Sequence, residues 1–67
     1  MPDLKSIGAK MALARKSAGL SQKALAEKIG TAQCLIAEYE SGVRSMTVAR
    51  FLEIANVLGV DAAKLLE

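Results

Sequence analysis

The chain has no histidine and no tryptophan, and it contains one cysteine, one proline and two aromatic residues, Tyr39 and Phe51. A single cysteine cannot close an internal disulfide, and without histidine the Cys/His zinc sites and most acid–base catalysis are excluded. No uncharged run approaches the roughly 18–20 residues that span a bilayer, and no secretory signal pattern opens the sequence. We therefore expect no enzyme, no metal, no cofactor, no small-molecule ligand and no membrane contact.

Aliphatic residues make up most of what is present: 52% of the 67 residues are hydrophobic and 24% are charged. A chain of this length buries only about 60% of the surface that its unfolded form exposes, so its elements must pack economically. Residues 1–28 carry six basic and two acidic side chains, whereas residues 29–67 carry three basic and five acidic ones. The basic N-terminal half is compatible with an anionic partner, or simply with solvated helix faces.

Regularly spaced glycines divide the chain into segments with helical periodicity, and each glycine can end a helix by adopting positive φ. These residues are Gly19, Gly30, Gly42 and Gly59. The first segment predicts a helix at about 4–18, and the third predicts one from Thr31 or Ala32 to about Ser41. The other three helices are predicted to follow N-cap residues, which are Ser21, Thr47 and Asp61. No useful period-2 alternation appears. We therefore predict an all-α bundle of five short helices, forming a single domain over residues 1–67 with an ordered core at about 5–66 and only the first few residues disordered.

The apolar positions of each segment predict which helix faces are buried. They are Ile7, Met11, Ala14 and Ala18 in the first helix, Leu25, Ala26 and Ile29 in the second, Ile36 and Tyr39 in the third, and Val48, Phe51, Leu52, Ala55 and Leu58 in the fourth. In the fifth segment, Val60 precedes the cap and can pack onto Leu65.

The most informative stretch runs from Gln22 to Glu40. Two helices joined by so short a turn must cross steeply, which requires a small residue, Ala26, at the crossing and a glycine, Gly30, in the turn. Ile36 and Tyr39 then pack the second of these helices onto the core. This spacing is typical of a helix-turn-helix.

With these residues in place, the chain resembles the Cro and phage-repressor family, also called the XRE-type helix-turn-helix family. The resemblance extends from about Ile7 to Leu66. It rests on Arg15, the segments 18–22 and 25–30, Ile36, Glu40, Gly42, Ala55, the segment 58–60, Leu65 and Leu66. It implies a cytoplasmic, bacterial or phage-type transcriptional regulator, a repressor by expectation, that binds double-stranded DNA as a homodimer with its third helix in the major groove.

The resemblance also implies which residues touch DNA. The base-facing positions are Gln33, Cys34, Leu35, Ala37 and Glu38, and the phosphate-contacting positions are Gln22, Arg44, Ser45, Thr47 and Arg50. Gln33 suits an adenine edge, and Leu35 and Ala37 suit thymine methyl groups. Arg15 and Glu40 correspond to an arginine and a glutamate that form a structural ion pair in similar proteins. The resemblance therefore implies that this pair orients the third helix. The dimer contact is expected around Val60, Leu65 and Leu66.

Several residues depart from the family pattern. The segment 33–40 contains two glutamates and no basic residue, although arginine–guanine is the commonest specific contact. Glu38 would then either accept a hydrogen bond from a cytosine amine or penalise nonspecific sites. Ala32 lacks the hydroxyl that relatives often carry there, and Leu13 is an apolar residue off the buried stripe. Cys34 is either a small exposed residue or a redox-active thiol near a helix N-terminus.

These departures leave a second hypothesis open. The chain could keep the helix-turn-helix fold as a protein-interaction module without tight DNA binding. Salt dependence separates the two functions, because a protein that contacts several phosphates loses affinity steeply as salt rises.

Overall fold

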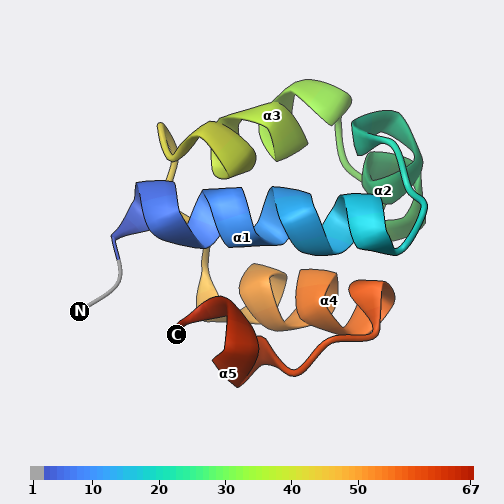
Figure 1. Ribbon diagram of the computed structural model, residues 1–67. Helices are drawn as coiled ribbons and strands as arrows, with labels where there is room; N and C mark the ends of the chain where they lie inside the picture. The colour runs from blue at the N-terminus through green and yellow to red at the C-terminus, as the bar shows by residue number, and fades with distance from the viewer. Residues whose placement is uncertain (1–2) are drawn as a thin grey trace.

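The computed structural model describes residues 3–67, and these residues form helices and connecting turns without a β-strand. The helices are α1 (Leu4–Ser17), α2 (Gln22–Ile29), α3 (Gln33–Ser41), α4 (Val48–Leu58) and α5 (Ala62–Leu65), shown in Figure 1. The all-α prediction is therefore confirmed. The expected disorder of the first residues concerns Met1 and Pro2, which lie outside the described residues, whereas Asp3 already caps α1.

Short polar side chains begin the helices where the sequence predicts them. The side chains of Ser21, Thr47 and Asp61 accept hydrogen bonds from backbone N–H groups in the first turns of α2, α4 and α5. Each such bond satisfies a donor that the helix itself leaves unpaired. The helix α3 differs, because its N-cap is Ala32 and no side chain caps it.

The longest helix, α1, runs through the middle of the molecule, with α3 on one side and α4 and α5 on the other (Figure 1). The helix α2 lies near one end of α1 and contacts both α3 and α4. The start of α1 and the C-terminal end of the chain lie at the opposite end of the molecule from α2. This arrangement leaves one side of α3 uncovered by any other helix.

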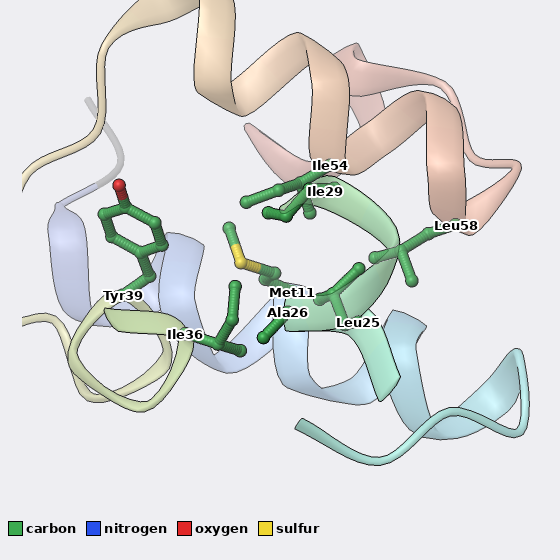
Figure 2. Close-up of a cluster of buried hydrophobic side chains, with 8 residues drawn as sticks. All are labelled: Met11, Leu25, Ala26, Ile29, Ile36, Tyr39, Ile54 and Leu58. Carbon is green, nitrogen blue, oxygen red and sulfur yellow. The ribbon is translucent and has the colours of Figure 1, made fainter. Parts of the chain in front are cut away.

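The core gathers around Met11, whose thioether lies among side chains from α2, α3 and α4 (Figure 2). Met11, Leu25, Ile36 and Ile54 are completely buried. Burying one such side chain contributes about 1.5–3 kcal/mol, so these four residues tie the helices into one cooperative unit. The predicted burial of Leu25, Ala26, Ile29, Ile36 and Tyr39 is confirmed.

The prediction for α4 is partly wrong. Val48 and Leu52 are 76% and 52% exposed, whereas Ile54, which the prediction omitted, is fully buried. The buried stripe of α4 is centred on Ile54, with Ala55 and Leu58 beside it. Val48 is the first residue of the helix and lies at the rim of the core. Its side chain and that of Leu52 therefore point to solvent although both are apolar.

Ala18 is also exposed rather than buried, because α1 ends at Ser17 and Ala18 is its C-cap. The predicted stripes of α1 and α4 both contain residues that are exposed in the structure, and a common reason applies. Helical spacing defines a stripe, but a short helix buries only the part of the stripe that another helix covers.

Glycine brings the backbones of α1 and α3 into near contact. A Cβ added at Gly8 would overlap the carbonyl oxygens of Tyr39 and Glu40, and one added at Gly42 would lie 2.7 Å from the Cα of Lys5. Gly8 is buried in the middle of a helix, where glycine costs about 1 kcal/mol relative to alanine. Its role is therefore the close approach of the two helices, which determines where α3 lies.

Candidate nucleic-acid interface

The turn between α2 and α3 is short because α2 stops abruptly at a glycine. Gly30 adopts the left-handed conformation with φ of 72°, and the backbone N–H of Thr31 donates to the carbonyl of Ala26 over 2.9 Å. These are the hydrogen bonds of a Schellman motif. Ala26 is only 2% exposed, which is consistent with a small residue at the helix crossing. The turn thus sends α3 away from α2 at a steep angle.

The outer face of α3 carries the side chains that the family resemblance assigns to DNA bases. Gln33 and Cys34 are exposed, and Ala37 and Glu38 are half-buried. Leu35 is different, because it is half-buried and packs against the hydrophobic core. Its side chain therefore contributes to the attachment of α3 as well as to the helix surface.

The two residues expected to form a structural ion pair lie in direct contact. Arg15 Nε donates to Glu40 Oε2 over 2.7 Å, and Arg15 Nη2 donates to Glu40 Oε1 over 3.2 Å. The two side chains are 9% and 6% exposed. A bidentate pair of this kind holds both partners in one orientation, so the end of α3 is fixed against α1.

Two further groups complete the environment of this pair. Arg15 Nη1 donates to the carbonyl of Leu20 over 2.7 Å, and Gln22 Nε2 donates to Glu40 Oε1 over 2.9 Å. The described residues contain no buried side-chain nitrogen or oxygen without a hydrogen-bond partner. Gln22, which the resemblance assigns to a phosphate, therefore also helps to hold Glu40.

A second ion pair lies on the surface of α3 and was not predicted. Arg44 Nε donates to Glu38 Oε1 over 2.7 Å, and the two side chains are 55% and 41% exposed. The hydrogen bond to the Glu38 carboxylate raises the pKa of the Arg44 guanidinium. Glu38 is thus paired, and its charge at the outer face of α3 is compensated locally.

The remaining residues assigned to phosphates lie between α3 and the first turns of α4. Ser45 and Thr47 are exposed, and the Thr47 hydroxyl accepts a hydrogen bond from the backbone N–H of Arg50 over 3.1 Å. Arg50 is half-buried: its Nη1 lies 3.5 Å from the carbonyl of Ile29 and 3.2 Å from Glu53 Oε1. A cation at the carbonyl end of α2 is electrostatically favourable, and it links α4 to the helix-turn-helix.

Other kinds of site find no support in the part of the chain that the structure describes. Residues 3–67 contain no cluster of three or more His, Cys, Asp or Glu side chains that could hold a metal ion. Over the same range, no helix is both long enough and apolar enough to cross a bilayer.

Two helices are joined by a short glycine turn, and the second of them, α3, has an uncovered outer face and is held in place by a buried ion pair. This arrangement defines a helix-turn-helix protein. A family model described as helix-turn-helix matches residues 11–65. The chain therefore belongs to the XRE-type helix-turn-helix family, and it is a DNA-binding transcription regulator. The family is regulatory rather than enzymatic.

Solved structures agree with this assignment. The restriction-modification controller protein C.AhdI from Aeromonas hydrophila is 27% identical, with a TM-score of 0.87 over 92% of this chain and 94% of that one. The DNA-binding domain of BldD from S. venezulae is 34% identical, with a TM-score of 0.82 over 92% of this chain and 93% of that one. The clp gene regulator ClgR from C. glutamicum, 24% identical, shares the fold with a TM-score of 0.89 over 98% and 87% of the two chains. A search of the curated proteins finds no match.

Proposed function

We propose that this protein binds a specific sequence of double-stranded DNA by inserting α3 into the major groove, and that it does so as a dimer that represses transcription in a bacterial or phage-infected cytoplasm. The observation that carries the proposal is the uncovered outer face of α3, which begins with the exposed side chains Gln33 and Cys34. A helix is about 10–12 Å wide with its side chains, and the major groove is about 12 Å wide. Only an uncovered helix can enter such a groove.

In this proposal Gln33 makes the main base contact, donating to N7 and accepting from N6 of an adenine. Cys34, Ala37 and the exposed part of Leu35 contact neighbouring base edges. The amide of Gln22, the hydroxyls of Ser45 and Thr47 and the guanidinium of Arg50 contact phosphates on either side. Because Arg50 is already held at the end of α2, it reaches a phosphate from a fixed position.

The acidic character of α3 was the main reason to consider an interaction module without DNA binding. Both glutamates of α3 have an arginine partner: Glu40 pairs with Arg15 and Glu38 pairs with Arg44. Each carboxylate repels a phosphate less when a guanidinium lies against it. This pairing supports DNA binding over the alternative.

The dimer is proposed to form through an exposed apolar face made by Leu4, Val48, Leu52 and Leu66. These residues surround a hollow of 340 Å³ over Ile7, Met46 and Phe51. Of the three residues expected at the interface from the sequence, Leu66 belongs to this face, whereas Leu65 is 3% exposed and Val60 packs on the core. A second copy of this chain offers the same apolar face, so a symmetric contact would cover both.

Selection of bound duplexes from a random pool, at a stated salt concentration, tests DNA binding. We expect one enriched sequence with two half-sites about one helical turn apart, and an affinity that falls steeply as salt rises. Gln33→Ala should relax the preference at one base pair by about 1–3 kcal/mol, whereas Asn56→Ala, an exposed amide on α4, should not. Failure to shift any duplex at low salt would favour the interaction module.

The dimer is tested separately by sedimentation. A variant with Val48→Lys and Leu52→Lys should sediment as a monomer and bind single half-sites weakly. Leu13→Lys is the matched control, because Leu13 is 67% exposed but lies outside this face. A dimer mass for both the wild type and the double variant would place the interface elsewhere.

A further inference from the structure

The loop after α3 is folded back over the helix by two parts of the same residue, Glu38. Its carbonyl accepts a hydrogen bond from the backbone N–H of Val43 over 3.1 Å, and its carboxylate accepts one from Arg44 Nε over 2.7 Å. Gly42 makes the turn possible with φ of 81°. As a result, the guanidinium of Arg44 lies against the outer face of α3, although Arg44 does not belong to the helix.

The way in which Arg44 is held leaves its recognition edge available. A guanidinium has one N–H on Nε and four on the two Nη atoms. Glu38 takes the Nε donor, and within residues 3–67 no other hydrogen bond to Arg44 is formed. The four Nη donors remain, and two of them on one edge match the O6 and N7 acceptors of guanine.

From this geometry we propose that Arg44 reads a guanine in the major groove and that Glu38 positions it for this contact. The proposal rests on the DNA-binding function argued above and changes two expected roles. Arg44 becomes a base-reading residue rather than a phosphate contact, and Glu38 acts through Arg44 rather than on a cytosine. It would also give guanine recognition to a helix whose own segment 33–40 has no basic residue.

Neighbouring charges are consistent with this role. Glu40, the other acidic residue of α3, is buried against Arg15 and does not compete for Arg44. Arg50 is engaged by Glu53 and by the carbonyl of Ile29. Glu38 and Arg44 therefore act as one unit on this surface, and the pair should respond as a unit to substitution.

The test uses the duplex selected by the full chain, with each guanine replaced in turn by 7-deazaguanine, which lacks the N7 acceptor. We expect one guanine in each half-site at which this replacement weakens wild-type binding by about 10-fold, the loss of one hydrogen bond to a charged group. Replacing the whole G·C pair by A·T should cost about 5- to 150-fold. In Arg44→Ala both penalties should disappear.

Two further variants separate base reading from charge. Arg44→Lys keeps the charge but not the planar fork, so it should lose the guanine preference and keep the salt dependence. Glu38→Gln should reduce the 7-deazaguanine penalty while Arg44 is present and have no effect in the Arg44→Ala background. Lys28→Ala, which removes an exposed charge on α2, is the control and should leave the penalty unchanged.

Three results would overturn the proposal. If Arg44→Ala weakens natural and modified duplexes equally, Arg44 contacts a phosphate. If no 7-deazaguanine replacement affects the wild type but Glu38→Gln changes the preference at a G·C pair, Glu38 reads the cytosine. If the selection recovers no duplex at low salt, the proposed function itself fails, and this inference fails with it.

Discussion

Removal of Arg15 should destabilise the domain more than removal of any exposed charge. Arg15→Met leaves the Glu40 carboxylate, 6% exposed, with the Gln22 amide as its remaining hydrogen-bond partner. Stranding one member of a buried ion pair costs about 3–5 kcal/mol. A domain of 67 residues has a total stability of roughly 3–10 kcal/mol at 0.05–0.15 kcal/mol per residue. The single variant should therefore be close to unfolding at room temperature.

The double variant Arg15→Met, Glu40→Leu tests the reason for this loss. It removes both charges together and fills the space with apolar atoms, so most of the lost stability should return. The carbonyl of Leu20 and the amide of Gln22 lose their partners, which limits the recovery. Arg15→Met, Glu40→Leu, the double variant and the wild type form a double-mutant cycle. Because each single substitution strands a buried charge and the double one does not, we expect a coupling energy at least as large as one single loss, about 3–5 kcal/mol.

Urea denaturation followed by far-ultraviolet circular dichroism measures these differences. With an m value of about 1 kcal/mol/M, the low end for small proteins, a loss of 3 kcal/mol lowers the midpoint by about 3 M. Lys64→Ala is the control, because the Lys64–Glu67 pair is 70% and 68% exposed and should contribute less than about 1 kcal/mol. If Arg15→Met lowers the midpoint no more than Lys64→Ala does, the argument from burial is refuted.

Three further changes test the local devices of the fold. Gly8→Ala should lower the melting temperature, since the clash with the carbonyls of Tyr39 and Glu40 costs about 1–3 kcal/mol beyond the helix propensity gained; a higher melting temperature would show that α1 and α3 can move apart. Thr47→Ala should lower the urea midpoint by the equivalent of about 1 kcal/mol, and Thr47→Ser should restore it, because the cap hydroxyl bonds the N–H of Arg50. The hydrogen bond from the Ser6 N–H lowers the pKa of Asp3, so its stabilising effect is complete above the ordinary value of 3.8 and is lost as pH falls through the lower folded value. Acidification from about pH 5 to about pH 2 should therefore shift the urea midpoint less in Asp3→Asn than in the wild type.

Features of the fold that depend on neighbours in the sequence were predicted correctly. The caps at Ser21, Thr47 and Asp61 and the glycines that end the helices act within a few residues of themselves. Their conformational preferences therefore operate before any tertiary contact exists. The five helices and their order follow from these signals.

Features that depend on the partner helix were predicted less well. Helical spacing could not distinguish Val48 and Leu52 from Ile54, since all three lie within a broad apolar stripe of α4. Gly8 was missed for a similar reason. A glycine inside a helix carries no local signal of close packing until the approach of α3 is known.

The candidate site also contains residues that could be predicted from local sequence and residues that could not. The positions of Gln33 and Cys34 on the outer face follow from helical geometry once Ile36 and Tyr39 are placed inward. The Glu38–Arg44 pair could not be predicted in this way, because it depends on the path of the loop after Gly42. The only available signal was indirect: an acidic residue on a surface expected to meet DNA needs a cation nearby.

The orientation of α3 and the chemistry of its surface are controlled by different residues. Gly8 and the Arg15–Glu40 pair hold the C-terminal half of α3 against α1 from the buried side, where a change costs stability. Gln33 and Cys34 are exposed and make no contact that the core requires. Substitutions at these two positions can therefore alter the preferred base with little effect on folding. Glu38 belongs to both the structural and the recognition residues. Its backbone carbonyl accepts the hydrogen bond from Val43 that closes the turn after α3, and its carboxylate holds Arg44 in the loop that follows. A change of specificity at Glu38 should consequently act through the position of the loop as well as through the bases that α3 meets.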